Sequence, residues 1–384
     1  MTPARQATYE ILMAAERGES IAFSLETRRQ SLSQQDSALA TELVYGVLRR
    51  RNQLDWLVLR ASGRQRLPVD PEVSTALRMG AYQLRFLARI PNHAAVSESV
   101  ELVKQYGKRS AAGLVNALLR KLPQLPKNWP DDATRLSMPN WLLERWRKAW
   151  GNEAAEAAAL AGIGTPQSYI RAIGSFGPPE GAETTEVTGC FVAPHPVPAG
   201  FRVQDIGSQW VAELLDVQPG NAVLDLCAAP GNKTAQAMES SPRVVVACDA
   251  SPRRLRAMAR SGVAEGARFV RLDGSRPLPF GRVFDRILVD APCSGTGTLA
   301  RNPDIKWRLT MDDIGRHAVR QKSMLSNALA CLKAGGRLVY STCSLEPEEN
   351  EAVVAEAASG RCVEAYSRLP GRDAGDGFQA AVIT

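Results

Sequence analysis

About the first 120 residues carry apolar side chains at helical spacing and show no strand-like alternation. Four segments show the spacing most clearly: QATYEILMAA (6–15), ALATELVYGVLRRRNQLDWLVLRA (38–61), STALRMGAYQLRFLARI (74–90) and AAVSESVELVKQYG (94–107). Pro91-Asn92 and Gly107 are plausible breaks between these helices. The pattern predicts an all-helical N-terminal domain.

From about residue 204 the pattern changes, and short apolar strands alternate with helical segments. The predicted strands are AVLDL (222–226), RVVVACD (243–249), ARFVRLD (267–273), FDRILVD (284–290) and GRLVYSTCS (336–344). A helix over 311–333 is expected between the last two strands. Such alternation is typical of an α/β domain with a mostly parallel, doubly wound sheet.

Between these two regions lies a stretch rich in Pro, Gly and Thr. It contains one helical segment, WLLERWRKAWGNEAAEAAALAG (141–162), and the weak strand signals SYIRAIG (168–174) and TEVTGCFVA (185–193). We therefore expect three parts: a helical domain over 1–124, a small linking subdomain over 125–200, and an α/β domain over 201–384.

The positive charge of the chain is concentrated near its N-terminus. Residues 1–150 contain 23 Lys and Arg against 14 Asp and Glu, whereas the remaining residues contain 24 against 26. The resulting local charge of +9 indicates a polyanionic partner such as a nucleic acid. A basic helical surface that only faces water is the alternative. The clusters LRRRN (48–52) and GKRS (107–110) are candidate RNA contacts.

Neither a membrane nor a metal is expected from the composition. No segment approaches the roughly 20 apolar residues that span a bilayer, and the N-terminus lacks a signal-peptide core. Seven cysteines without a CxxC pair, and the widely separated His93, His195 and His317, argue against zinc and against a disulfide framework. We expect a cytoplasmic protein and a monomer.

Acidic residues end successive predicted strands. Because ligands of doubly wound sheets bind at the carboxyl ends of the strands, these acids and the cysteine after the fifth strand are candidate site residues. They are Asp225, Asp249, Asp273, Asp290 and Cys343. The alternative is that each Asp only caps the helix that follows it.

The loop LDLCAAPGNKT (224–234) joins the first of these strands to a helix. It matches neither GxGxxG nor the P-loop pattern, so it has no phosphate cradle. Asp249 could bind ribose hydroxyls, and Asp273 could reach an adenine edge. The pattern fits S-adenosylmethionine, whose adenosine has free ribose hydroxyls and no phosphates.

Two cysteines follow neighbouring predicted strands, Cys293 in DAPCSGTG (290–297) and Cys343 in YSTCS (340–344). A buried cysteine usually acts as a small apolar side chain. Two thiols that converge on one pocket are instead candidates for nucleophilic chemistry, for which helix N-termini and Lys233 could lower a thiol pKa.

At these motifs the chain resembles a known family. DLCAAPGNKT, DAPCSGTG, RNPDIKW (301–307) and STCSLEPEEN (341–350) resemble, in order, motifs of the RNA 5-methylcytosine methyltransferases of the Sun/Fmu/NOL1/NOP2 family. RVQDIGSQW (202–210) and DGFQAAVIT (376–384) resemble its flanking elements. LVYGVLRRRNQLDWL (43–57) and IPNHAAVSESVELVK (90–104) resemble the NusB-like RNA-binding domain of its bacterial 16S rRNA member.

The resemblance implies a Rossmann-like class I methyltransferase domain behind a NusB-like domain, and methylation of carbon 5 of a cytosine in 16S rRNA. It assigns the attacking thiol to Cys343 and product release to Cys293, while Asp290 holds the cytosine edge and Lys233 helps to hold the base. It implies an S-adenosylmethionine site made of Cys227, Ala228, Ala229, Pro230, Gly231, Asn232, Lys233, Asp249, Asp273 and Asp290.

Two positions depart from the family pattern. Asn232 replaces a usual Gly; because Asn tolerates positive φ, we expect that a left-handed turn could survive there. The closing DGFQAAVIT replaces an aromatic-basic ending, which puts one RNA or packing contact in doubt. Arg301 and Lys306 suit phosphate contacts, and Trp307 could stack on a base or pack under the loop.

Other functions remain open on the residues alone. A DNA cytosine methyltransferase would use a Pro-Cys thiol as the nucleophile and would not need Cys343. An amino-group methyltransferase would need no thiol. A tRNA-directed enzyme of the same chemistry, or a non-catalytic RNA-binding assembly factor, are further alternatives; retention of both cysteines and the acids argues against the last.

Overall fold

The computed structural model describes residues 1–64, 70–174, 177–194 and 196–384, so His195 and the segment 65–69 lie outside it. The described residues form two compact units. The N-terminal unit comprises Met1–Arg145, Gly162–Gly164 and Arg301–Arg308, and the C-terminal unit comprises Trp146–Ala161, Thr165–Ala300 and Leu309–Thr384.

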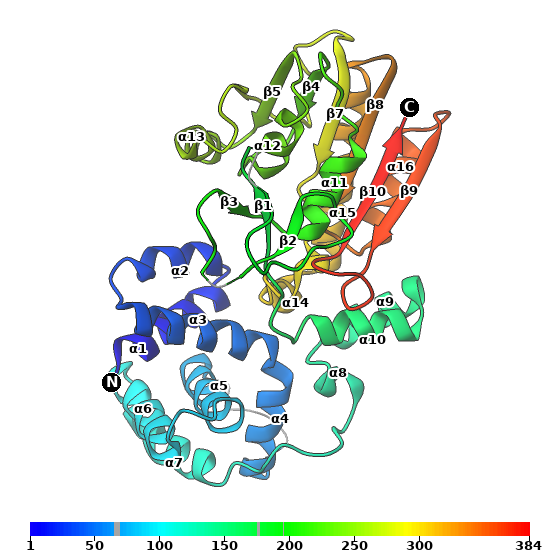
Figure 1. Cartoon of the computed structure of the whole chain (residues 1–384). Helices are drawn as coiled ribbons and strands as arrows, with labels where there is room; N and C mark the ends of the chain where they lie inside the picture. The colour runs from blue at the N-terminus through cyan, green and yellow to red at the C-terminus, as the bar shows by residue number, and fades with distance from the viewer. Residues whose placement is uncertain (65–69, 175–176, 195) are drawn as a thin grey trace. The chain divides into compact units, whose positions relative to one another are not determined.

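The N-terminal unit is helical, as the apolar spacing predicted. Its core contains side chains from successive helices, among them the fully buried Leu43, Leu54, Leu77, Leu102 and Val115. The described helices are α1 (Pro3–Glu16), α2 (Ile21–Arg29), α3 (Gln34–Arg49), α4 (Arg51–Ser62), α5 (Pro71–Phe86), α6 (Asn92–Gln105), the 3₁₀ helix η1 (Arg109–Ala111), α7 (Ala112–Arg120) and α8 (Asp132–Arg135) (Figure 1).

The arginines of LRRRN lie at the junction of α3 and α4, and the fold uses their side chains. Arg49 is 9% exposed and its guanidinium lies over the Tyr45 ring. Arg50 lies over the Phe86 ring, and Arg51 forms an ion pair with Glu16 at 3.1 Å. These contacts hold the arginines against their own unit, so substituting them would change packing as well as charge.

The short helix α14 (Ile305–Arg308) also packs in the N-terminal unit, although it follows the α/β strand β7 in sequence. The ammonium of Lys306 donates to the Arg49 carbonyl oxygen at 3.0 Å, and the indole nitrogen of Trp307 donates to that of Leu48 at 2.7 Å. Both bonds satisfy carbonyl groups at the C-terminal end of α3. The expectation of a phosphate contact is wrong for Lys306, which is 1% exposed, and Trp307 packs against the hydrophobic core.

The C-terminal unit contains, within its described residues, a seven-stranded sheet of order β6-β5-β4-β7-β8-β10-β9. The first five of these strands are parallel, and β10 pairs antiparallel with both β8 and β9 (Figure 1). The strands are β4 (Ala222–Asp225), β5 (Val244–Asp249), β6 (Arg268–Arg271), β7 (Phe284–Asp290), β8 (Leu332–Thr342), β9 (Val363–Arg368) and β10 (Phe378–Ile383). The mostly parallel sheet predicted from the alternation is confirmed.

Helices cover both faces of this sheet because the strands are apolar on both sides. Residues of α15 and α16 pack on one face, and residues of α11, α12 and α13 pack on the other. The helices are α11 (Ile206–Leu214), α12 (Asn232–Met238), α13 (Pro252–Ser261), α15 (Met311–Leu329) and α16 (Glu351–Ala357), with the 3₁₀ helices η2 (Thr296–Thr298) and η3 (Pro347–Glu349). The expected helix 311–333 is too long, since β8 already begins at Leu332.

A small sheet and two helices precede the large sheet in sequence. In the described residues β1 (Tyr169–Ala172) pairs antiparallel with β2 (Cys190–Val192) and β3 (Phe201–Val203). The predicted helical segment is two helices, α9 (Asn140–Trp150) and α10 (Asn152–Ala161), because Gly151 between them has φ +83°. The Trp146 indole donates to the buried Glu346 carboxylate at 2.9 Å, which ties α9 to the segment after β8.

Candidate active site

The topology of the sheet places its switch point between β4 and β7. From β4 the chain adds β5 and β6 on one side, and from β7 it adds β8 on the other. In open α/β sheets ligands bind beside such a point, at the carboxyl ends of the strands. Asp225 ends β4, Asp249 ends β5 and Asp290 ends β7, whereas Cys343 directly follows β8.

A cavity of about 530 Å³ lies at these strand ends, within the size range of ligand pockets. The predicted site residues that line it are Cys227, Ala229, Asp249, Asp290, Cys293 and Cys343. The other predicted residues, which do not line it, are Asp225, Ala228, Pro230, Gly231, Asn232, Lys233 and Asp273. The sequence motifs gave no indication of Arg254 and Arg320, which also line the cavity.

Asp273 differs from the other strand-end acids. The expectation that it ends a strand is wrong, because β6 ends two residues earlier at Arg271. Its carboxylate accepts hydrogen bonds from the Ser275 backbone N–H at 3.1 Å and the Ser275 hydroxyl at 2.8 Å, and these bonds lower its pKa. Leu272 and Gly274, on either side of it, line the cavity.

The loop after β4 turns sharply at Gly231. Gly231 has φ +113°, and an added Cβ would lie 2.6 Å from a Val263 methyl group, so only Gly fits. Asn232 begins α12 and has no positive φ, so the expected left-handed turn at Asn232 is wrong. Its side-chain amide instead donates to the Val203 carbonyl oxygen at 3.2 Å.

Asp225 is a buried acid beneath this loop. One of its carboxylate oxygens accepts from the Thr234 hydroxyl at 2.6 Å, and the other has no hydrogen-bond partner among the described residues. Burial is the main reason that the pKa of Asp225 rises to about 6. An unpaired oxygen of this kind is suited to a donor group of a ligand.

Asp290 and Lys233 form an ion pair at the end of β7. The Lys233 ammonium lies 2.7 Å from one Asp290 oxygen, and the Ser341 hydroxyl donates to the other at 2.9 Å. The Phe378 ring of β10 lies 5.2 Å from the Lys233 ammonium, within range of a cation–π contact. The altered C-terminal segment therefore contributes both a fully buried strand and a contact to this pair.

The two thiols predicted to converge do so. The sulfur atoms of Cys293 and Cys343 lie 3.5 Å apart, because β7 and β8 are parallel neighbours. The hydrogen bond with Cys343, burial, and the charges of Cys343 and Glu349 raise the pKa of the Cys293 thiol well above its ordinary value. A thiol that keeps its proton is a weak nucleophile.

Metal-binding arrangements are not found here: within the described ranges no group of three His, Cys, Asp or Glu side chains is placed to hold a metal ion. In the same part of the chain no helix is long and apolar enough to cross a membrane. All seven cysteines are free thiols in the described residues.

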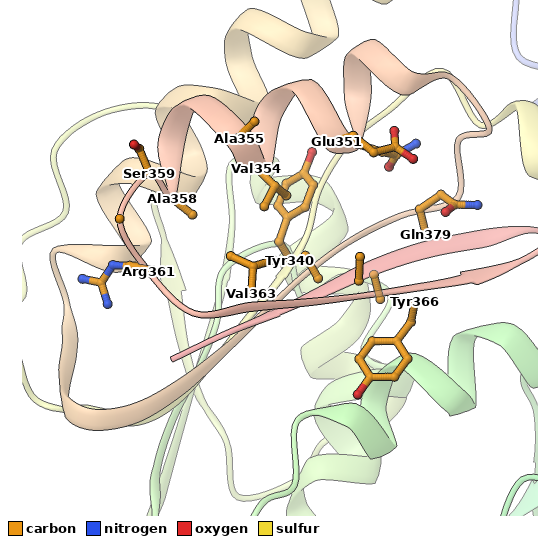
Figure 2. Close-up of a pocket in the computed structure, with 15 residues that line it drawn as sticks. Tyr340, Glu351, Val354, Ala355, Ala358, Ser359, Arg361, Val363, Tyr366 and Gln379 are labelled. Carbon is orange, nitrogen blue, oxygen red and sulfur yellow. The ribbon is translucent and has the colours of Figure 1, made fainter. Parts of the chain in front are cut away.

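A second cavity, of about 460 Å³, lies in the same unit between α16 and the strands β9 and β10 (Figure 2). Its walls are mainly aliphatic and aromatic, with Val354, Val363, Tyr340 and Tyr366 among them. It contains neither of the paired thiols and none of the strand-end acids, so the chemistry-bearing residues belong to the first cavity.

A doubly wound parallel sheet with a helical domain before it, and a site of strand-end acids and paired thiols, define a Rossmann-like methyltransferase. Residues 212–381 match the family model described as 16S rRNA methyltransferase RsmB/F, and residues 2–124 match that of the NusB family. The chain belongs to the RsmB/F methyltransferase family, and the resemblance seen in its motifs is confirmed.

Individual relatives match over nearly the whole chain. The ribosomal RNA small subunit methyltransferase B of Cronobacter sakazakii is 33% identical, over 97% of this chain and 96% of that protein. A probable ribosomal RNA small subunit methyltransferase B of Synechocystis is 32% identical, over 92% and 88%. A solved methyltransferase homologue from Pyrococcus horikoshii is 28% identical, with a TM-score of 0.54 over 65% of this chain and 96% of that one.

Proposed function

We propose that the protein transfers a methyl group from S-adenosylmethionine to carbon 5 of a cytosine in 16S rRNA, through a covalent adduct with Cys343. The 3.5 Å pair of thiols at the ends of β7 and β8 carries this proposal. Methyl transfer to an exocyclic nitrogen needs no thiol, whereas carbon 5 of cytosine becomes nucleophilic only after a nucleophile has added to carbon 6. The relatives' names support rRNA as the substrate.

The residues fit S-adenosylmethionine. Asp249 lines the cavity at the end of β5, where a carboxylate can hold ribose hydroxyls. At the end of the neighbouring strand β4, one buried oxygen of Asp225 has no hydrogen-bond donor among the described residues. Cys227, Ala229 and Asp290 also line this cavity and would contact other parts of the bound cofactor. When bound, this cofactor supplies an electrophilic methyl group.

In the proposed reaction Cys343, Asp290 and Cys293 each have a separate role. The Cys343 thiolate adds to carbon 6, forming a sulfur–carbon bond, and the electron pair of the 5,6 double bond moves toward N3. Asp290, held by Lys233 and the Ser341 hydroxyl, would hydrogen-bond the cytosine edge near N3. After methylation, the proton on carbon 5 passes to a water molecule that acts as the base, and the electron pair of that C–H bond re-forms the 5,6 double bond. The sulfur–carbon bond then breaks with its electron pair on the Cys343 sulfur, which returns the thiolate. Cys293, which keeps its own proton, would assist this release. The target base must be unpaired or flipped out.

The first experiment is methyl transfer from labelled S-adenosylmethionine to unmodified small-subunit rRNA, with the product nucleoside identified by mass spectrometry. We expect 5-methylcytidine at a single position. Label on a cytosine amino group, or methylation of tRNA and not rRNA, would overturn the proposal. RNA binding without any methyl transfer would instead indicate an assembly factor.

The N-terminal unit is proposed to bind the RNA through exposed cations such as Arg109, which lies in GKRS beside Lys104. Arg109→Ala should weaken rRNA binding about two- to tenfold and flatten the slope of log affinity against log salt by roughly 0.7–0.9, because one phosphate contact is lost. Filter binding over a salt series measures both quantities. The matched control is Arg372→Ala, an exposed arginine of the C-terminal unit, which should leave affinity and slope unchanged.

A further inference from the structure

A fully buried acid, Glu349 at the end of η3, lies beside the two cysteine loops. Its carboxylate accepts from the Ser294 backbone N–H at 2.9 Å and from the Gln321 side-chain amide at 3.2 Å. It also accepts short hydrogen bonds from the hydroxyls of Ser294 and Ser344. A carboxylate so enclosed is retained at a considerable desolvation cost, which these donors offset.

The donors belong to the residues next to the thiols. Ser294 directly follows Cys293, and Ser344 directly follows Cys343. The two serine hydroxyls also lie 3.0 Å from each other. The Gln321 amide that reaches Glu349 donates as well to the Pro292 carbonyl oxygen at 2.9 Å, on the other side of Cys293. Glu349 is therefore the common acceptor of both loops.

We propose that Glu349 is a positioning residue that fixes the Cys293 loop against the Cys343 loop and places a negative charge beside Cys293. This charge favours the protonated Cys293 thiol while Cys343 reacts. The proposal rests on the proposed function for the roles of the two thiols. The positions of the two loops and of the negative charge are inferred only from the hydrogen bonds of Glu349 described above.

The charge of Glu349 acts with the other groups around Cys293. Cys343 and Glu349 raise the pKa of the Cys293 thiol, and the Gly295 backbone N–H lowers it. The cavity that Cys293 lines also contains the titratable or charged groups Cys227, Asp249, Asp290, Arg254 and Arg320. Glu349 differs from these because it contacts the residue next to each thiol.

The test compares Glu349→Gln, which keeps the size and removes the charge, with Glu351→Gln, an exposed glutamate two residues further on. Alkylation of each cysteine by iodoacetamide is followed by peptide mass spectrometry over a pH series. We expect the pH midpoint for Cys293 to fall by about one unit in Glu349→Gln, because a nearby charge of like sign is removed. Glu351→Gln should match the wild type. An unchanged Cys293 midpoint in folded Glu349→Gln overturns the proposal.

A second variant separates position from charge. Glu349→Asp keeps the charge but shortens the side chain by one methylene, so the Cys293 midpoint should stay close to that of the wild type. The loops should then be misplaced, and protein–rRNA adduct should accumulate several-fold while kcat falls. If turnover and adduct level match the wild type, the positioning role is refuted. Alkylation uses neither RNA nor methyl donor, so its outcome is independent of the proposed function.

Discussion

Replacing Cys343 with alanine should reduce methyl transfer to rRNA by a factor of about 10³ or more, because removal of a covalent nucleophile has effects of this order or larger. The covalent protein–RNA adduct should disappear with it. Cofactor binding should be retained, since the S-adenosylmethionine site is proposed to lie mainly on the loops after β4 and β5. The measurement is labelled methyl transfer together with denaturing gel electrophoresis for adduct, and a binding titration for the cofactor.

Cys293→Ala is the matched variant, because it removes a thiol only 3.5 Å away and leaves the proposed nucleophile in place. Turnover should fall, but adduct should accumulate above the wild-type level, since addition to carbon 6 proceeds and release is slowed. The opposite pattern, an active Cys343→Ala and an inactive Cys293→Ala without adduct, would show that the two thiols have their roles reversed. Loss of adduct in both variants would contradict the division of roles.

Much of the site could be predicted because it is built from local patterns. Asp225, Asp249 and Asp290 each follow an apolar run, and such runs in an alternating α/β pattern become parallel strands whose ends meet. Asp273 follows a similar run, but the strand pairing stops at Arg271, and no periodicity in the sequence marks that end. The predicted helix 311–333 was too long for a related reason, since apolar residues continue from α15 into β8.

The residues that could not be predicted depend on distant partners. Glu349 stands in the acidic run EPEEN and looks like a solvated charge, yet it accepts from Ser294, which is 55 residues away. Lys306 looks like a phosphate contact, yet its acceptor Arg49 is 257 residues away. In both cases the role of the side chain depends on which distant residues the tertiary fold brings next to it. The local pattern of a single sequence does not contain that information.

The buried Lys306 should make the stability of the folded protein depend on pH. Burial, and then the charges of Arg49 and Arg50, lower the pKa of the Lys306 ammonium to about 7. In the unfolded chain this pKa returns to its ordinary value of about 10.4, so between these values the unfolded state binds more protons than the folded state. The free energy of unfolding should therefore rise with pH across this range, by about 1.4 kcal/mol per pH unit at most.

Lys306→Met isolates this contribution, because methionine has a similar length and does not titrate. Urea unfolding followed by circular dichroism at pH 7 and pH 9.5 should show the wild type gaining roughly 3 kcal/mol relative to the variant. The gain follows from deprotonating a buried ammonium whose acceptor among the described residues is the Arg49 carbonyl oxygen. Lys121→Met, at an exposed lysine of the same unit, should leave the difference from wild type constant over this range. A constant difference for Lys306→Met as well would mean that solvent reaches the ammonium, and that α14 does not stay packed on the end of α3 in solution.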